Sequence, residues 1–287
     1  MSSGFSHIAV FGPGLMGASL LMALRQKSPQ TKLSVWARRD EAAREIASRG
    51  LAEVASTDSV EVLHGADTVV LCVPVDQMAV VASSIAPHAE ADTLVTDVGS
   101  TKGKMTPSLE QIFSSHRNFV GSHPMCGSEE SGLEAARPDL YQGALCVVCP
   151  TKSSRKDLID RAEKLWQTLG ARTAILSPEA HDAATATASH VPHVAAAALV
   201  ELAAQESDEF RKLCASGFRD TTRIAAGSPT LWSAILGGNA EQTAEGLARL
   251  EGILKGYREA LLRGDRAEIE RRLAAAAKNR AKIFPNT

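Results

Sequence analysis

Three glycines near the N-terminus have the spacing of a phosphate-binding turn. They lie in Gly12-Pro13-Gly14-Leu15-Met16-Gly17, directly after a short apolar run and at the start of a helical pattern. In a strand–turn–helix unit the first two glycines permit a tight turn close to a pyrophosphate, and the third lets helix and strand pack closely. The N-terminus of that helix offers free N–H groups to the phosphates. This placement predicts a dinucleotide site, with a glycine-rich structural turn as the alternative.

The residues expected to bind the adenosine ribose favour NADP. In NAD-binding sites an acidic residue usually lies about 20 residues beyond the fingerprint. Here that position is Ala37, and Arg38 and Arg39 follow it. A guanidinium can hold the 2′-phosphate of NADP through paired hydrogen bonds. NADP is therefore the favoured cofactor. NAD is the alternative, in which the arginines are surface residues and Asp40 serves as the acid.

A histidine in a block of small residues is a candidate for proton transfer. His123 lies in Gly121-Ser122-His123-Pro124-Met125, which follows a predicted strand, and the polar block at 97–102 (DVGSTK) follows another. In an open parallel sheet, ligands bind at the carboxyl ends of the strands. Histidine is the side chain that most readily exchanges a proton near neutral pH. His123 is therefore a candidate proton acceptor beside a nicotinamide, with a packing histidine as the alternative.

The other histidines and the paired cysteines do not have the spacing of a metal site. On a continuous helix His181 and His190 lie about 180° apart, and Pro192 offers only a kink. Cys146 and Cys149 fall in a predicted strand, where their odd spacing puts the thiols on opposite faces. We therefore predict no metal site.

Two arginines four residues apart form a candidate carboxylate site. Arg219 and Arg223 lie in the segment GFRDTTRIA at 217–225. At this spacing they share one helix face and could grip a carboxylate together. The alternative is an exposed pair neutralised by Asp220.

Alternating apolar runs and helical patterns predict the elements that position these residues. Strands are expected at residues 7–11, 32–36, 68–73, 93–97, 119–122, 145–149 and 172–176, and helices between them at 15–25, 40–49 and 76–86. This alternation indicates βαβ units and a mostly parallel sheet. From residue 178 the alanine-rich sequence is helical, with helices expected at 183–198, 195–204, 241–262 and 266–281. We predict an α/β, Rossmann-type dinucleotide-binding domain over residues 1–177 and an all-α domain over 178–287.

Composition excludes several classes of function. The chain has 287 residues and a formal net charge of −2, which gives no electrostatic basis for binding nucleic acid or an anionic membrane. No run reaches the roughly 18 apolar residues of a membrane helix, and the N-terminus lacks the basic segment of a signal peptide. Five cysteines are too few, and odd in number, for a disulfide framework. We expect a cytoplasmic enzyme that acts on a small molecule.

Six segments together carry a resemblance to a known family. They are GPGLMGASL at 12–20, DVGSTK at 97–102, GSHPMCGSEESG at 121–132, SHVPH at 189–193, GFRDTTRIA at 217–225 and SPTLW at 228–232. In these segments the chain resembles the prephenate/arogenate dehydrogenase family of tyrosine biosynthesis. The resemblance implies a helical C-terminal domain that forms a homodimer. It also implies a minimal member, without room for a fused chorismate mutase or a C-terminal regulatory domain.

The resemblance implies a role for individual residues. The family's catalytic histidine falls on His123 and its partner serine on Ser100. The substrate-contacting histidine falls on His193, the arginine that binds the ring carboxylate on Arg223, and a tryptophan near the substrate side chain on Trp232. The expected cofactor contacts are Gly12, Gly14, Leu15, Met16, Gly17, Arg38, Arg39, Val73, Pro74 and Ser100.

The implied reaction is an oxidative decarboxylation. Prephenate would give 4-hydroxyphenylpyruvate, or arogenate would give tyrosine, with hydride transfer to NAD(P)⁺. Since His123 must be neutral to accept the hydroxyl proton, we expect kcat to rise with pH at about pH 6–7. Many family members have an acid where this chain has Ala37. The alternatives are a β-hydroxyacid dehydrogenase, which would need a catalytic lysine, and a non-catalytic dinucleotide sensor.

Overall fold

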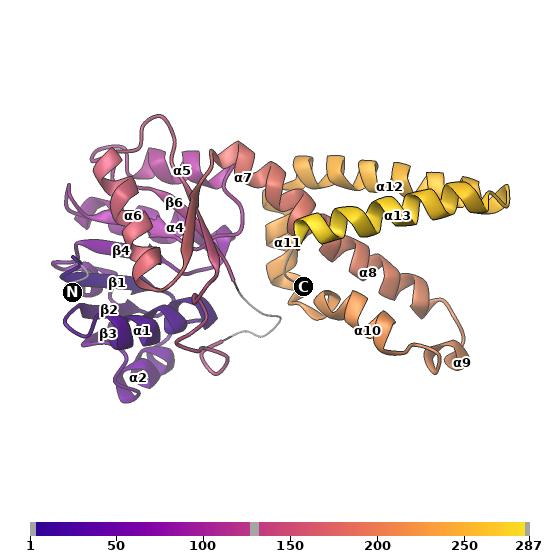
Figure 1. Cartoon of the computed structure of the whole chain (residues 1–287). Helices are drawn as coiled ribbons and strands as arrows, with labels where there is room; N and C mark the ends of the chain where they lie inside the picture. Colours follow the sequence, from indigo (N-terminus) through magenta and orange to yellow (C-terminus); the bar gives the residue numbers. More distant parts are fainter. Residues whose placement is uncertain (1–3, 127–131, 285–287) are drawn as a thin grey trace. The chain divides into compact units, whose positions relative to one another are not determined.

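The computed structural model describes residues 4–126 and 132–284, whose helices and strands are drawn in Figure 1. The chain divides into two compact units, Met1–Ala240 and Glu241–Thr287. All of the described strands belong to the first unit, and two long helices make up most of the second. None of the described helices combines the length and the apolar character that a membrane crossing requires.

The larger sheet of the first unit consists of five parallel strands in the order β3-β2-β1-β4-β5. This is the strand order of a dinucleotide-binding Rossmann half. The strands are β1 (His7–Phe11), β2 (Lys32–Trp36), β3 (Val54–Ser56), β4 (Thr68–Leu71) and β5 (Leu94–Asp97), and the connecting helices are α1 (Leu15–Lys27), α2 (Asp40–Ser48), α3 (Ser59–Leu63), α4 (Val75–Ile85) with a 3₁₀ turn (Ala86–His88), and α5 (Met105–Ile112).

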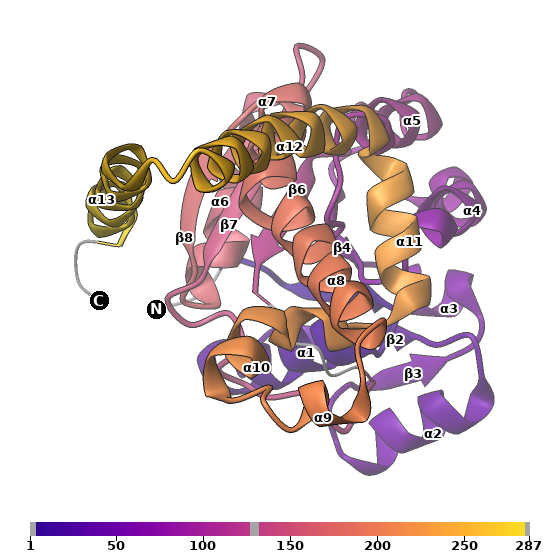
Figure 2. The same cartoon turned by 90° about the vertical axis from the view of Figure 1, so that its right-hand side faces the viewer.

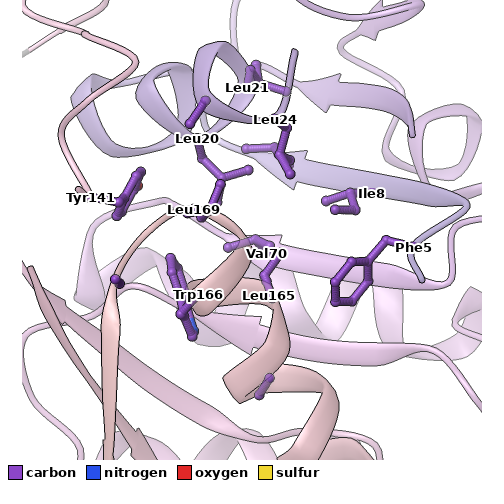
Figure 3. Packing of buried hydrophobic residues seen from close by; sticks show 14 of the residues in the cluster. Phe5, Ile8, Leu20, Leu21, Leu24, Val70, Tyr141, Leu165, Trp166 and Leu169 are labelled. Carbon is purple, nitrogen blue, oxygen red and sulfur yellow. The ribbon is translucent and has the colours of Figure 1, made fainter. Parts of the chain in front are cut away.

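The central strands are buried along their whole length because helices cover both faces of the sheet. Every residue of β1 and β4 is buried, as expected of a parallel sheet. Figure 3 shows one of the two resulting cores, to which Leu20 and Leu24 of α1 and Ile8 of β1 all belong. Trp166 of α6 (Lys156–Thr168) belongs to the same cluster and is fully buried. This packing fixes the start of α1, and with it the glycine turn.

A second sheet of three strands changes the placement predicted for His123. Its strands are β6 (Gly121–Met125), β7 (Leu145–Cys149) and β8 (Arg172–Ile175), with β6 antiparallel and β8 parallel to β7. The strand predicted at 119–122 begins only at Gly121 and continues to Met125, because Phe119 makes a single parallel bridge with Val95 before the chain pairs with β7. His123 therefore lies within a strand and not after one.

No described residue after β8 belongs to a strand, in agreement with the predicted helical C-terminal part. The helices are α7 (Pro178–Thr185), a π turn (Ala186–His190), α8 (Val191–Ala204), α9 (Asp208–Arg211), α10 (Ser216–Thr222), a 3₁₀ turn (Arg223–Ala226), α11 (Pro229–Gly238), α12 (Ala240–Leu262) and α13 (Arg266–Ile283). Within the first unit, α10 and the following 3₁₀ turn pack on α8 (Figures 1 and 2). The boundary at residue 177 stays a prediction, since the two compact units divide at Ala240.

Candidate active site

The turn between β1 and α1 contains three glycines, and the space around them differs: two have no room for a side chain and one does. Gly12 has φ of +109°, and a Cβ there would lie 2.7 Å from the carbonyl oxygen of Cys72. A Cβ on Gly17 would lie 2.0 Å from the carbonyl oxygen of Gly12, whereas one on Gly14 would meet nothing within 4 Å. The fold itself therefore requires Gly12 and Gly17, while Gly14 keeps space open at the start of α1.

That open space fits a pyrophosphate. No side chain caps the N-terminus of α1, and its first turn has no acidic residue, so its N–H groups are available to an anion. The turn lies where β1 separates β2 from β4, the switch point at which Rossmann folds bind their cofactor. Val73 borders the turn, 3.1 Å from a Cβ placed on Gly12, and Pro74 is the N-cap of α4. The hydroxyl of buried Tyr141, a residue not singled out in the sequence, donates to the Met16 carbonyl at 2.7 Å.

Alanine substitutions distinguish the glycine that the fold requires from the glycine that only leaves space open. We expect Gly17→Ala to lower the free energy of unfolding by at least about 2 kcal/mol, because its methyl group meets backbone 2.0 Å away. The matched variant Gly14→Ala should change that free energy by less than about 0.5 kcal/mol. Urea unfolding measures both. Equal losses of stability in the two variants would contradict this account of the turn.

The two arginines after β2 are exposed. Neither Arg38 nor Arg39 makes an ion pair with a residue in the described part of the chain, while Ala37 is fully buried. Arg39 is the N-cap of α2, and Asp40 is the first residue of that helix. The Asp40 carboxylate accepts a hydrogen bond from the Thr57 hydroxyl at 3.2 Å. Among the described residues, neither guanidinium group has an ion-pair partner, so both are available to an anion.

His123 is the first member of a hydrogen-bonded chain of three side chains. It is half-buried in β6, and its Nδ1 lies 2.8 Å from Nε2 of His181, which is fully buried at the start of α7. Nδ1 of His181 lies 2.8 Å from Oδ1 of Asp182. A carboxylate only accepts, so His181 donates from Nδ1 and accepts at Nε2. Neutral His123 therefore carries its proton on Nδ1 and presents a free lone pair at Nε2.

Asp182 is held as a carboxylate. Burial alone would raise its pKa, but the hydrogen bonds from His181 and from the N–H groups of Gly103 and Lys102 outweigh burial, and the pKa is lowered. The two N–H groups donate at 2.7 Å and 2.8 Å, respectively. An ionised Asp182 maintains the tautomer of His181, and through it that of His123. The loop after β5 is thereby tied directly to α7.

The surroundings keep His123 neutral to lower pH than the sequence suggested. Burial is the main cause that lowers its pKa well below the ordinary value, and the nearby Lys102, His181 and His190 lower it further. The rise of kcat with pH should therefore occur below the range of about pH 6–7 that an unperturbed histidine implies.

A π turn places the later histidines relative to His181. Val191 donates its N–H to the carbonyl of Ala186, five residues back, directly before Pro192, which has no N–H to donate. On a regular helix His181 and His193 would lie about 120° apart, and the extra residue of the π turn reduces this to about 20°. The expectation of one continuous helix with at most a kink was thus wrong.

His193 and Trp232 form a stacked pair. Their ring centroids are 3.5 Å apart with an interplanar angle of 14°. His193 is buried, and its Nδ1 has no hydrogen-bond partner among the described residues. Gly227, which follows the 3₁₀ turn that starts at Arg223, packs against both rings, since a Cβ there would lie 2.6 Å from Trp232 Nε1 and 3.4 Å from His193 Cε1. A buried, unpaired imidazole nitrogen is available to a ligand.

The remaining candidate residues lie on neighbouring segments. Ser100 is half-buried in the loop after β5, and Arg223 is exposed at the start of the 3₁₀ turn that packs on α8. Arg219 is also exposed and lies 3.6 Å from the carboxylate of Asp220. No group of three or more His, Cys, Asp or Glu residues in the described ranges is arranged to hold a metal ion.

Two family models together match most of the chain. The model of the prephenate dehydrogenase nucleotide-binding domain matches residues 20–175, and that of the prephenate dehydrogenase dimerization domain matches residues 177–275. The chain belongs to the prephenate dehydrogenase family. The resemblance seen in the sequence motifs and the predicted fold class are thus confirmed, and the β-hydroxyacid dehydrogenase alternative is not supported.

Relatives with this fold include enzymes named for both candidate substrates. Prephenate dehydrogenase from Bacillus subtilis is 34% identical over 233 residues, covering 80% of this chain but only 63% of the relative. Cyclohexadienyl dehydrogenase from Zymomonas mobilis is 31% identical and covers 91% of this chain and 90% of its own. Prephenate dehydrogenase from Aquifex aeolicus, in complex with hydroxyphenyl propionate and NAD⁺, is 29% identical with a TM-score of 0.92 over 98% and 99% of the chains. Synechocystis arogenate dehydrogenase is 28% identical, with a TM-score of 0.84 over 97% and 100%.

Proposed function

We propose that this chain catalyses the oxidative decarboxylation of prephenate, or of arogenate, with transfer of a hydride to a nicotinamide dinucleotide, in tyrosine biosynthesis. The observation that carries the proposal is the hydrogen-bonded chain from His123 through His181 to Asp182. It leaves one imidazole nitrogen ready to accept a proton, in a family whose members are dehydrogenases. The glycine turn, the pair of His123 and His181, and the stacked pair of His193 and Trp232 all belong to the first compact unit.

In this proposal His123 accepts the proton of the substrate hydroxyl at Nε2. When bound at the glycine turn, the dinucleotide supplies a nicotinamide ring that accepts the hydride from the carbon bearing that hydroxyl. His181 and Asp182 keep the Nδ1–H of His123 directed away from the substrate and stabilise the imidazolium that forms. Ser100, on the loop held by the same network, would position the substrate hydroxyl. Loss of carbon dioxide then yields an aromatic ring, which drives the reaction forward.

The substrate would be held by His193, Trp232 and Arg223. The unpaired Nδ1 of buried His193 supports a role in hydrogen bonding to the substrate. Stacking on Trp232 holds that imidazole in one orientation. Arg223, on the turn that leads to Gly227, would bind a carboxylate of the dianionic substrate through a charge-assisted pair.

For Arg223→Ala we expect mainly a higher KM for prephenate, because the carboxylate loses its charged partner in both the ground state and the transition state. A charge-assisted hydrogen bond contributes about 1.5–3 kcal/mol, so KM should rise roughly 10- to 100-fold with kcat little changed. Steady-state kinetics measure this, with Arg219→Ala as the matched control on the preceding helical turn. If KM rises only in Arg219→Ala, Arg219 is the binding residue instead.

We also infer that the chain forms a homodimer. The two helices of the second unit expose several large apolar side chains, namely Ile253, Leu254, Leu261, Leu262, Leu273 and Ile283. Such a surface is rarely left in water, and the matching family model describes a dimerization domain. Sedimentation at micromolar concentration should give a particle of twice the 30.3 kDa of one chain. A particle with the mass of a single chain would contradict this inference.

The decisive test is turnover of the purified protein with prephenate and with arogenate, each in the presence of NAD⁺ and of NADP⁺. Formation of reduced cofactor with either substrate supports the proposal and identifies the substrate. A protein that binds the dinucleotide but turns over neither substrate would be a sensor and not an enzyme.

A further inference from the structure

Asn239 is a buried amide side chain that contacts two other segments of the candidate active site. It directly follows α11, the helix that carries Trp232. Its Nδ2 lies 2.8 Å from the backbone carbonyl oxygen of Asp182, in α7, and 3.2 Å from Nδ1 of His190, in the π turn. The end of α11 is thereby tied both to α7 and to the π turn.

These two contacts determine how the amide and the imidazole are oriented. A backbone carbonyl oxygen only accepts hydrogen bonds, so the atom of Asn239 that faces Asp182 is the amide nitrogen, which has two N–H bonds to donate. The second N–H bond is left for Nδ1 of His190, which accepts it with a lone pair. Neutral His190 therefore carries its proton on Nε2.

The surroundings of His190 favour the neutral form. Burial is the main cause that lowers its pKa; the Asp182 carboxylate opposes this effect, and His181 and His193 lower the pKa further. Protonation at Nδ1 would also place an N–H bond of His190 against the N–H bond of Asn239, so that their hydrogen bond would be lost.

The imidazole of His190 packs in turn against the stacked aromatic pair. Its ring is nearly perpendicular to that of Trp232, with an interplanar angle of 86° and a centroid distance of 6.3 Å, an arrangement that aromatic rings favour. Trp232 stacks on His193, whose buried Nδ1 has no hydrogen-bond partner among the described residues. A series of direct contacts thus leads from the amide of Asn239 to the nitrogen proposed to bind the substrate.

The residue before Asn239 brings the same end of α11 close to the loop of Ser100. A Cβ on Gly238 would lie 2.9 Å from Oγ1 and 3.2 Å from Cγ2 of Thr101, the buried residue that follows Ser100. Only glycine permits so close an approach without displacement of that loop. The end of α11 is therefore held from a second side, and Asn239 is kept where its amide reaches His190.

We propose that Asn239 is a positioning residue of the substrate site, whose amide fixes the tautomer and the orientation of His190 and thereby holds Trp232 and His193 in their stacked arrangement. The consequence for the substrate rests on the proposed function, because only that function places a substrate against His193. The tautomer and the stacking can be measured without any turnover.

The first test is NMR of the histidine rings in the full chain without cofactor, at about pH 7.5, where an ordinary histidine is neutral. The signals of His190 and His193 are assigned from their loss in His190→Gln and His193→Gln. In the wild type, Nε2 of His190 should be protonated and Nδ1 unprotonated. In Asn239→Asp, whose carboxylate only accepts, Nδ1 of His190 should become protonated.

The same spectra report on the stacked pair. Protons that lie over an aromatic ring resonate upfield, so the ring protons of His193 should be shifted upfield by Trp232 in the wild type. In Asn239→Asp and in the charge-free Asn239→Leu, these signals should move downfield, toward their positions in Trp232→Leu.

Steady-state kinetics supply the second test. Both Asn239 variants should raise the KM for the substrate that the wild type turns over by roughly 3- to 10-fold, the worth of one hydrogen bond, with kcat little changed. A merely structural role would instead reduce the amount of folded enzyme and lower the apparent kcat at an unchanged KM. Asn118→Leu is the matched control, since Asn118 is also buried and donates to a backbone carbonyl, that of Glu90, at 3.1 Å. Urea unfolding verifies that each variant is folded.

A protonated Nδ1 on His190 in the wild type overturns the proposal without any variant. An unprotonated Nδ1 in folded Asn239→Asp also overturns it, and so do unmoved His193 signals or an unchanged KM in both folded Asn239 variants. An equal rise of KM in Asn118→Leu has the same consequence. If the NMR results are as expected while the wild type turns over neither prephenate nor arogenate, the positioning role stands and only the proposed function fails.

Discussion

His123→Asn is expected to lower kcat by about 10²–10⁴-fold, the usual contribution of a general base, while the KM for prephenate changes little. Asparagine is a close replacement for the shape of the network, because its side-chain N–H can still donate to Nε2 of His181 as Nδ1 of His123 does. It has no counterpart of the Nε2 lone pair. The loss should therefore fall on the chemical step and not on substrate binding.

The pH dependence and a matched control make this result specific. Since the pKa of His123 lies well below the ordinary value, wild-type kcat should already be near its plateau at pH 6 and fall only at lower pH. His116→Asn, which changes an exposed histidine, should retain full activity. A His123→Asn enzyme that keeps most of its kcat would remove His123 from the mechanism.

The second large effect concerns the cofactor. With exposed Arg38 and Arg39 at the end of β2, the wild type should prefer NADP⁺ to NAD⁺ by about 10- to 100-fold in kcat/KM, the worth of one charged hydrogen bond to the 2′-phosphate. Arg38, nearer the end of the strand, is the first candidate for that contact. The double change Ala37→Asp, Arg38→Asn should reverse the preference, because it supplies an acceptor for the ribose and removes the phosphate contact.

Single variants separate the two contributions. Arg38→Asn alone should lower kcat/KM with NADP⁺ without improving NAD⁺, and it avoids placing a new carboxylate at the fully buried Ala37 position. Arg44→Asn, an exposed arginine of α2, controls for the general loss of positive charge. A wild type that uses NAD⁺ as well as NADP⁺ would contradict the prediction, and the arginines would then be surface residues.

Local sequence signals predicted the elements of the parallel sheet well. Strands β1, β2 and β7 begin and end at the residues that their runs in the sequence predicted. The short strand β3 and helices α3 and α6 were not predicted. The three residues of β3 are only partly buried and leave no distinct apolar run. Helix α6 does bury one face, formed by Leu158, Ala162, Leu165 and Trp166.

The glycine positions of the cofactor turn could also be predicted from the sequence, because the spacing of the three glycines is a feature of one short segment. The hydrogen bond between His123 and His181 could not be predicted, because 58 residues separate the two histidines and only the folded chain brings helix α7 next to β6. In the sequence, His181 stands out only as a possible metal ligand. The pairing of β6 with β7 decides that His123 lies inside a strand, and that depends on tertiary contacts. Lys102 was visible in DVGSTK, but its burial was not.

The π turn has a consequence for how this helix could change over evolutionary time. Insertion or deletion of one residue within Ala186–His190 turns everything beyond it by about 100° about the helix axis, while His181 and its partners before the turn stay in place. The proton-accepting half of the site and the half that surrounds the substrate can therefore be adjusted separately. A chain that must keep one chemistry while it exchanges a keto for an amino substrate would have in this turn a simple means of doing so.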